Sequence, residues 1–195
     1  MNEMRITIIG GGAAGMMAAA SASVADSSTE ITVIERNEKL GRKVVISGGG
    51  RCNLTTGTTN INDLMRKYPR GSRWLKFAMH EFNPKDCYEF FESNGVPLKI
   101  EGNRVFPKSE RGEDVVGMFL KIFRNNNVKV LNKKIVQNIE KSGEIYKIIL
   151  DDGSILESDK VILTTGGSAY SKTGSKGDGY KFAKALGHTV TKTVP

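Results

Sequence analysis

The hydrophobic pattern of the chain begins with two short apolar runs separated by an alanine-rich stretch. Arg5 to Ile9 is rich in β-branched residues, which predicts a short buried strand. Met16 to Ala25 is rich in alanine, the strongest helix former, and predicts a helix. Ile31 to Ile34 predicts a second strand. A strand, a helix and a strand in this order are typical of α/β proteins with a parallel sheet.

The rest of the chain alternates between helical and strand patterns separated by turn residues. A helix interrupted at Pro69 and Gly71 is expected between residues 61 and 79, and another is expected to follow the N-cap residue Asn83. The later expected elements are a hairpin at 98–100 and 104–106, a helix at 112–124, a strand at 128–131, a three-stranded meander at 135–140, 146–150 and 154–157, a strand at 160–163 and a helix at 178–186. This order predicts a nucleotide domain built from both ends of the chain, with a helical insert at about residues 61–126.

A glycine-rich turn lies between the first strand and the first helix. Gly10, Gly12 and Gly15 fill a G-x-G-x-x-G pattern: the first permits a tight turn, the second lets the backbone approach a pyrophosphate, and the third lets the helix pack close to the strand. Glu35 ends the second strand, twenty residues after Gly15, where a carboxylate can accept hydrogen bonds from the hydroxyls of an adenosine ribose. In this setting the pattern predicts dinucleotide binding. The alternative is a glycine-rich turn that binds nothing.

A second glycine-rich stretch runs from Ser47 to Thr55 and contains three consecutive glycines at 48–50. Such a run does not support a helix or strand interior, but it suits a backbone that lies close to a flat ligand. A flexible linker is the alternative. The polar residues Arg51, Cys52 and Asn53 that follow make a linker a poorer explanation, and they are the candidate catalytic residues. For Cys52, a structural role as a small residue at a crowded position is the favoured interpretation.

Composition is that of a folded globular protein. The 195 residues include 38% hydrophobic and 26% charged residues, and the formal net charge is +8. We interpret the basic residues as scattered along the chain rather than clustered with aromatic residues. This interpretation predicts a solvated surface and no nucleic-acid partner. No apolar run reaches the length of a membrane span, so no membrane partner is expected. Cys52 and Cys87 form no C-x-x-C motif, which favours a reducing cytoplasm, no disulfide and no metal site.

Three motifs resemble those of a known family. They are the stretch from Gly41 to Thr55 (GRKVVISGGGRCNLT), the run from Arg104 to Ser109 (RVFPKS) and the run from Gly174 to Tyr180 (GSKGDGY). With the elements above, they resemble the aminoacetone-oxidase-like family of FAD-dependent flavoproteins, which also includes proteins similar to bile-acid reductases. The resemblance covers residues 4 to about 195. It implies a Rossmann-like FAD-binding parallel sheet with a three-stranded β-meander crossover and a helical insert.

The resemblance also implies which residues bind FAD. The pyrophosphate would lie at the first glycine turn and beneath the loop at 165–167, the adenosine at Glu35 and Ile135, and the flavin ring at the second glycine-rich stretch. The expected cofactor-binding residues are Gly10, Gly12, Ala13, Ala14, Gly15, Glu35, Arg36, Arg42, Lys43, Ser47, Gly48, Gly49, Arg51, Cys52, Asn53, Ile135, Thr165, Gly166, Gly167 and Asp178.

The expected function is that of an FAD-dependent oxidoreductase. It would transfer hydride between a small organic substrate, or transiently bound NAD(P)H, and FAD. Family members are about twice as long as this chain. The chain is therefore expected to be a fragment or a truncated gene product that self-associates through the surface left open. The alternatives are a catalytically inactive nucleotide-binding half and a flavoprotein that acts on tRNA.

Overall fold

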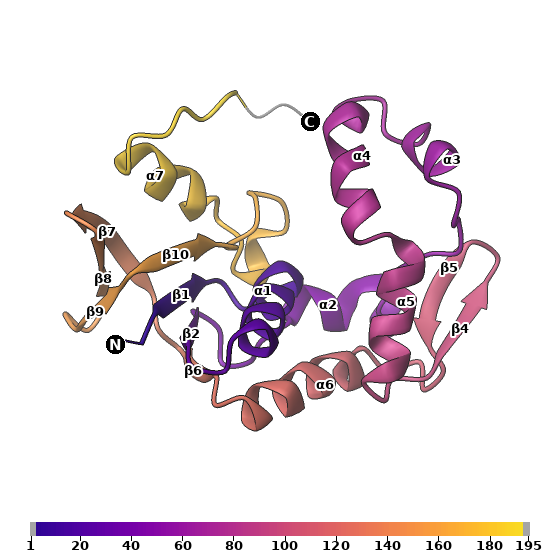
Figure 1. Cartoon of the computed structure of the whole chain (residues 1–195), viewed down its shortest axis with the longest axis horizontal. Coiled ribbons are helices and arrows are strands. Elements are labelled where there is room, and N and C mark those ends of the chain that lie inside the picture. Colours follow the sequence, from indigo (N-terminus) through magenta and orange to yellow (C-terminus); the bar gives the residue numbers. More distant parts are fainter. Residues whose placement is uncertain (1–2, 193–195) are drawn as a thin grey trace. The chain divides into compact units, whose positions relative to one another are not determined.

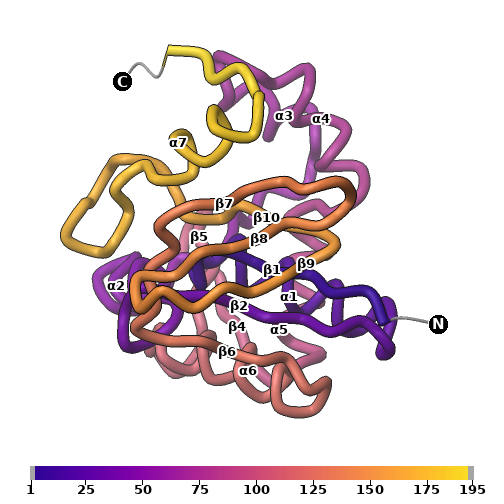
Figure 2. The backbone as a smooth tube through the Cα atoms, turned by 90° about the vertical axis from the view of Figure 1, so that its left-hand side faces the viewer, coloured from indigo at the N-terminus to yellow at the C-terminus, as the bar shows by residue number. Residues whose placement is uncertain are grey.

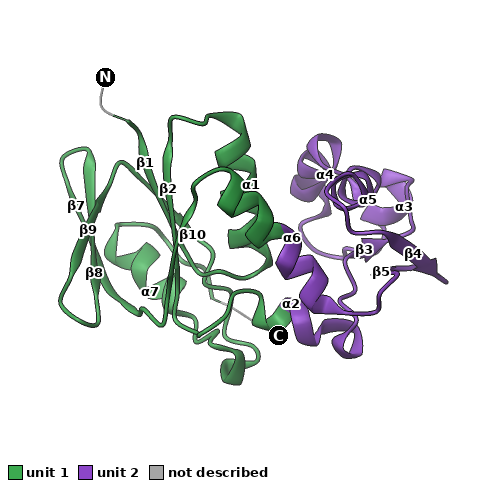
Figure 3. Cartoon of the chain, turned by 90° about the horizontal axis from the view of Figure 1, so that it is seen from below, with its two compact units in different colours: residues 1–43, 119–195 green, residues 44–118 purple. Residues whose placement is uncertain are grey.

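The computed structural model describes residues 3–192 (Figure 1). These residues divide into two compact units (Figure 3). Within the described residues, the sheet unit takes residues 3–43 and 119–192, and the insert unit takes residues 44–118. The insert thus begins before the expected position near residue 61 and ends before residue 126. Its early start has a physical basis in the close packing of Gly112 on Val45, where an added Cβ at Gly112 would lie 2.8 Å from the Cα of Val45.

The centre of the sheet unit is a four-stranded parallel sheet in the order β10-β1-β2-β6. Its strands are β1 (Arg5–Ile9), β2 (Glu30–Glu35), β6 (Lys129–Asn132) and β10 (Lys160–Leu163). From β1 the chain continues through β2 to β6 at one edge, whereas β10 pairs with the other side of β1. The strand order therefore reverses between β1 and β10. Open α/β sheets bind ligands at such a switch point, beyond the carboxyl ends of the strands.

Opposite faces of the central sheet are covered by a helix and by an antiparallel meander (Figure 3). The helix is α1 (Ala13–Ala25), and the meander consists of β7 (Val136–Ser142), β8 (Ile145–Leu150) and β9 (Ile155–Ser158). The meander strands run beside the central strands (Figure 2). Ile9 and Ile34 from the sheet share one buried core with Ile148 from the meander and Phe182 from α7 (Asp178–Ala185). The predicted parallel sheet and its meander crossover are confirmed.

The insert unit combines helices with a small antiparallel sheet. Its elements are β3 (Thr55–Thr56), α3 (Ile61–Met65), α4 (Ser72–Glu81), α5 (Pro84–Ser93), β4 (Leu98–Glu101) and β5 (Arg104–Pro107). The strands pair in the order β3-β5-β4, so the predicted hairpin gains a third strand from the chain that follows the second glycine-rich stretch. Two helices, α2 (Arg42–Ile46) and α6 (Gly112–Asn125), each begin in one unit and end in the other.

Local sequence signals account for the helix ends. The side chain of Asn83 accepts hydrogen bonds from the backbone N–H groups of Lys85 and Asp86, and the Asp86 carboxylate accepts one from the Asn83 N–H. This capping box, with Pro84 at the first helical position, fixes the start of α5 where the sequence predicts it. α1 begins at Ala13, three residues before the expected Met16.

Two kinds of feature are absent from residues 3–192. None of the described helices combines the length and hydrophobicity that a membrane crossing requires. Within the same residues, no three His, Cys, Asp or Glu side chains are grouped as potential metal ligands.

Candidate functional site

The first glycine turn is tied to both strands that flank β1. The Gly10 N–H donates to the carbonyl of Ile34 near the end of β2, over 2.8 Å. The hydroxyl of Thr164, just beyond β10, donates to the carbonyl of Gly10 over 2.8 Å. The turn therefore lies at the switch point of the sheet, where ligands bind in this fold class.

The three glycines of the turn meet different surroundings. Gly10 has a φ of +106°, and an added Cβ would lie 2.5 Å from the carbonyl oxygen of Thr164. At Gly15 an added Cβ would lie only 1.9 Å from the carbonyl oxygen of Gly10, so any side chain would push α1 away from the turn. At Gly12, by contrast, an added Cβ would meet no atom within 4 Å. Gly10 and Gly15 are thus required by the backbone, whereas Gly12 borders open space.

The N-terminus of α1 faces that open space without a side-chain cap. Gly12 is its N-cap residue, and no side chain hydrogen-bonds to the first turn. The first N–H groups of a helix, here including those of Ala13 and Ala14, have no intrahelical acceptor. They also carry the positive end of the helix dipole. The arrangement suits an anionic group such as a phosphate.

Glu35 lies at the end of β2 with 7% of its surface exposed. Its Oε2 accepts a hydrogen bond from the Gly11 N–H over 2.8 Å. Its Oε1 accepts two from Asn37, from the backbone N–H over 2.8 Å and from Nδ2 over 2.6 Å. The Asn37 Oδ1 in turn accepts a hydrogen bond from the Arg42 guanidinium over 3.4 Å. An ionised carboxylate has about four acceptor positions, so one is left for a ligand hydroxyl.

Arg36 and Asp178 were expected to contact the cofactor, and they form an ion pair with each other. The Arg36 Nη2 lies 2.8 Å from the Asp178 Oδ2, and its Nη1 donates to the carbonyl of Gly174 over 3.2 Å. Beside Asp178, the Gly179 N–H donates to the hydroxyl oxygen of Thr165 over 3.0 Å. The end of β2 is thereby joined to the loop after β10 and to the first turn of α7.

The loop after β10 approaches Lys43. Gly166 has a φ of +74°, and an added Cβ there would lie 2.9 Å from the Ser175 Oγ and 3.5 Å from the Lys43 Nζ. At Gly167 an added Cβ would lie 3.3 Å from the Tyr180 hydroxyl. Two residues expected at the cofactor and distant in the sequence, Lys43 and Gly166, are therefore neighbours in the sheet unit.

Ile135 was expected to contact adenine through its backbone. In the structure its N–H donates to the Asp151 carboxylate over 3.1 Å, and its carbonyl accepts from the Asp151 N–H over 2.9 Å. The N–H is therefore engaged within the protein. The carbonyl oxygen has a second lone pair, which can still accept a hydrogen bond from a ligand.

The second glycine-rich stretch forms a tight turn in the insert unit. Gly48, Gly49 and Gly50 have φ values of +58°, +73° and +93°, a region that favours glycine. An added Cβ at Gly48 would lie 2.9 Å from the Phe106 ring, whereas Gly49 and Gly50 border open space. The Cys52 N–H closes the turn by donating to the carbonyl of Ser47 over 2.9 Å. The defined backbone argues against a flexible linker.

Arg51 is held by two carboxylates. Its guanidinium lies 4.1 Å from the centre of the Phe106 ring, with Nη1 2.8 Å from Glu101 and 3.6 Å from Glu110. The hydrogen bond to Glu101 raises the pKa of Arg51. The Lys99 ammonium, followed by Arg51, lowers the pKa of Glu101. The positive charge of Arg51, expected to assist a reduced flavin, is therefore balanced within the insert unit.

Cys52 and Asn53 lie in contrasting environments. Cys52 is 3% exposed with a φ of +61°, and its burial raises the pKa of its thiol. A buried thiol with a raised pKa is a poor nucleophile, so the structure favours the interpretation of Cys52 as a small residue at a crowded position. The Asn53 side chain is exposed, and it has no hydrogen-bond partner among the described residues.

Comparison with known proteins agrees with this geometry. Residues 4–194 match the family described as the HI0933-like protein Rossmann domain. The chain belongs to this family. The 3-dehydro-bile acid delta(4,6)-reductase of Clostridium scindens is 33% identical over 191 residues, which are 98% of this chain and 46% of the relative. The ribosomal RNA dihydrouridine synthase of Escherichia coli is 26% identical over 193 residues, 99% of this chain and 47% of the relative.

The chain spans about half the length of these curated relatives. Among solved structures, that of Thermovibrio ammonificans THI4 is similar with a TM-score of 0.54 and 12% sequence identity, over 88% of this chain and 61% of that one. At this identity the likeness concerns the fold.

Sequence reasoning missed several residues of this HI0933-like site. Thr164 fastens the glycine turn, Ser175 packs against Gly166, and Asn37 holds Glu35. Thr164 contacts Gly10, which is distant in the sequence, and Ser175 contacts Gly166 across the loop after β10. Asn37 makes its contact through a side-chain amide in a polar loop. Asn37 is the one with a local signal, since it follows the strand-ending Glu35 by two residues.

Proposed function

We propose that the sheet unit binds FAD through the adenosine diphosphate part of the cofactor. The observation that carries this proposal is the uncapped N-terminus of α1, bordered by open space at Gly12 and located at the switch point of the parallel sheet. A helix N-terminus in this position attracts a pyrophosphate. Glu35, at the end of the adjacent strand, suits the ribose hydroxyls.

Each expected contact has a chemical role in this proposal. The N–H groups of the first glycine turn and of Ala13 and Ala14 would bind the pyrophosphate, and Lys43 near Gly166 would add a positive charge. In the insert unit, the open backbone at Gly49 and Gly50 would provide a surface for the flat flavin ring. The resemblance of the stretch from Gly41 to Thr55 to that of the aminoacetone-oxidase-like flavoproteins supports this contact with the flavin ring.

The proposed activity is that of an FAD-dependent oxidoreductase acting on a small organic substrate or on NAD(P)H. When bound, the flavin supplies the hydride chemistry, while the protein binds and orients it. The 33% identity to a reductase from Clostridium scindens over 98% of this chain supports the reaction class. Of the three candidate catalytic residues, Asn53 is the one with an exposed side chain available to a substrate.

The cofactor is tested by purifying the full-length protein and releasing bound flavin by heat. We expect a yellow protein whose released cofactor runs with FAD on a column, because FMN lacks the adenosine that Glu35 would bind. Glu35→Ala should release less flavin than the wild type, and Glu140→Ala, at an exposed glutamate of the meander, is the matched control that should release as much. Recovery of FMN alone, or of no flavin after soaking with FAD, contradicts the proposal.

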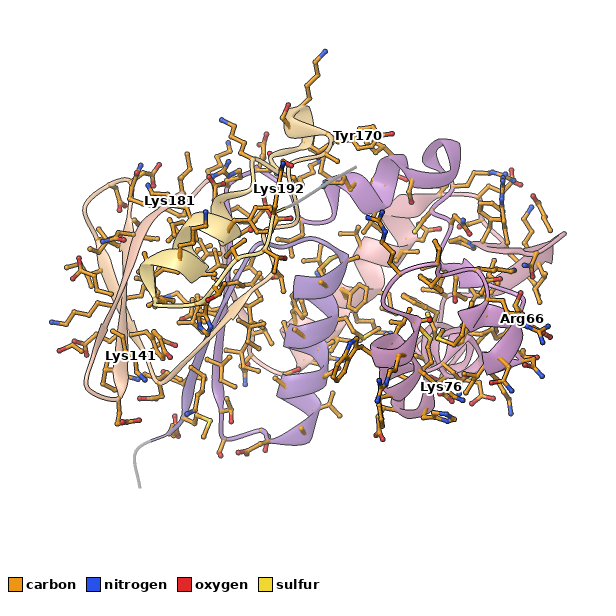
Figure 4. All side chains as sticks on the ribbon, turned by 90° about the horizontal axis from the view of Figure 1, so that it is seen from above. Arg66, Lys76, Lys141, Tyr170, Lys181 and Lys192 are labelled. Atoms are coloured by element: carbon orange, nitrogen blue, oxygen red, sulfur yellow. The ribbon has the colours of Figure 1, made fainter. Side chains whose placement is uncertain are left out.

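A second candidate function is RNA modification by a flavoprotein, and one surface of the insert unit favours it. Five basic residues and no acidic residue lie between positions 66 and 77. In α4, Trp74 and Phe77 are 77% and 71% exposed on the solvent side of the helix. Figure 4 shows Arg66 and Lys76 pointing away from the ribbon. Cations that contact phosphates and rings that stack on bases are the elements of single-stranded RNA binding.

This cluster differs from the expected scatter of basic residues, and it is the reason to propose RNA as a partner although none was expected. The E. coli relative, 26% identical over 99% of this chain, is named as a ribosomal RNA dihydrouridine synthase. The test compares RNA binding by the wild type, by Trp74→Ala/Lys76→Glu and by the control Lys141→Glu/Lys181→Glu in gel-shift titrations. Weaker binding confined to the first variant supports RNA as a partner. Equal binding by all three, or none by any, favours a small-molecule oxidoreductase.

A further inference from the structure

The side chain of Asn37 bridges three parts of the sheet unit. Its Nδ2 donates to the Glu35 Oε1 over 2.6 Å and to the carbonyl of Thr173 over 3.1 Å. Its Oδ1 accepts from the Arg42 guanidinium over 3.4 Å. The amide thus joins the end of β2 to the start of α2 and to the loop that leads to α7.

Asn37 provides two of the three hydrogen bonds that hold Glu35. Both fall on Oε1, from the backbone N–H and from Nδ2, while Oε2 has the single bond from Gly11. Each hydrogen bond narrows the rotation of the carboxylate about its terminal bond, and the 2.6 Å bond from the Asn37 Nδ2 is the shortest of the three. Loss of the Asn37 amide would leave one backbone bond at each oxygen, which widens that rotation, and would remove the hydrogen bond to the carbonyl of Thr173.

Gly174 shows that the approach of the loop to Asn37 is specific. It has a φ of +97°, and an added Cβ would lie 2.8 Å from the Asn37 Nδ2 and 3.1 Å from the Arg36 Cδ. Any side chain at this position would displace the amide. The loop backbone is thus shaped to receive the two residues that follow Glu35.

We infer that Asn37 is a positioning residue that sets the orientation of the Glu35 carboxylate for the ribose hydroxyls of the nucleotide. The inference rests on the proposed binding of FAD. Asn37 itself need not touch the ligand. It acts by fixing the acceptor lone pairs of Glu35, and its bond to Thr173 ties that orientation to the loop after β10.

The test measures how well the full-length protein distinguishes ADP from 2′-deoxy-ADP by isothermal titration calorimetry. The wild type is expected to prefer ADP by roughly tenfold, the effect of one hydrogen bond to a charged group. Asn37→Ala should reduce this preference to about twofold. Asn37→Asp, of the same shape, should do the same, because its carboxylate cannot donate to Glu35 or to Thr173. The matched control is Asn138→Ala, since the Asn138 amide donates to the exposed Glu140 over 3.0 Å on the meander.

A double-mutant cycle separates positioning from a general structural role. In a Glu35→Ala background the preference for ADP should already be lost, and Asn37→Ala should change it no further. If Asn37→Ala and Asn37→Asp weaken both nucleotides equally and keep the wild-type preference, the inference is wrong. If the wild type binds neither nucleotide, the proposed nucleotide site itself fails. If it binds both equally, the nucleotide site stands, but Glu35 does not contact the 2′-hydroxyl and the inference is wrong.

Discussion

Gly12, the N-cap residue of α1, and Gly15, in the first turn of α1, should respond differently to substitution by alanine. At Gly15 the new Cβ would lie 1.9 Å from the carbonyl oxygen of Gly10, whereas carbon and oxygen atoms in contact are about 3.3 Å apart. At Gly12 the new Cβ meets no atom within 4 Å, and its φ of −79° is open to alanine. Gly15→Ala should therefore damage folding, and Gly12→Ala should damage ligand binding.

The expected magnitudes follow from these distances. Gly15→Ala must move backbone by more than an ångström, which costs about 3 kcal/mol or more and lowers Tm by roughly 6–12 °C. Gly12→Ala loses a favourable N-cap residue, a cost of about 0.5–1 kcal/mol. Its methyl group occupies the space proposed for the pyrophosphate, which should weaken FAD by at least roughly tenfold, or about 1.4 kcal/mol.

Thermal unfolding without ligand and FAD titration by flavin fluorescence distinguish the two variants. Gly117→Ala is the matched control, because Gly117 lies within α6, is surrounded by open space and is remote in sequence from the turn. Unfolding of Gly15→Ala at the wild-type temperature would show that α1 does not need close contact with the turn. Binding of FAD by Gly12→Ala as tightly as by the wild type would show that the pyrophosphate lies elsewhere.

Glu35, the Arg5–Asp159 pair and the two cysteines can each be tested by substitution or chemical modification. Glu35→Ala should weaken FAD by roughly ten- to a hundredfold, with a smaller loss for Glu35→Gln, and an unchanged titration in both would show that the carboxylate does not contact the ribose. The hydrogen bond from Arg5 lowers the pKa of Asp159, so this pair stabilises the fold above the ordinary carboxylate pKa of 3.8 and loses its effect as the pH falls through the lowered value. Asp159→Asn should therefore lower Tm at pH 7, with a difference that shrinks below about pH 4; a constant difference from pH 7 to pH 3 would exclude this explanation. Burial raises the pKa of both Cys52 and Cys87, so iodoacetamide at pH 7 should modify neither until the insert unit unfolds, and rapid modification of Cys52 in the folded protein would point to an activated thiol.

Much of the local structure was determined by the sequence alone. The β-branched run at 5–9, the alanine-rich helix and the capping box at Asn83 act within a few residues, and the structure has all three. The glycine pattern could also be recognised in the sequence. Gly10 and Gly15 are required by the tight turn and by the close packing of helix on strand, which are local features of a strand–turn–helix unit. The three meander runs and their turns predicted an antiparallel meander that the structure confirms, whereas its place as a crossover was implied by the resemblance to the flavoprotein family.

Tertiary structure alone decided which distant residues meet at the candidate site. Asn37 and Thr173 are 136 positions apart in the sequence, and Arg51 and Glu101 are 50 positions apart. No local sequence pattern therefore predicts either contact. The partners of Arg51 changed its expected role, because a cation balanced by two carboxylates offers less charge to a ligand. The aromatic and basic surface of α4 also depends on the fold, since Leu75 and Met79 are half-buried whereas Trp74 and Phe77 lie in solvent. Hydrogen bonds and burial between distant segments form only when the chain folds and brings those segments together. The sequence pattern reflects interactions between residues that are close along the chain, so it cannot predict these contacts.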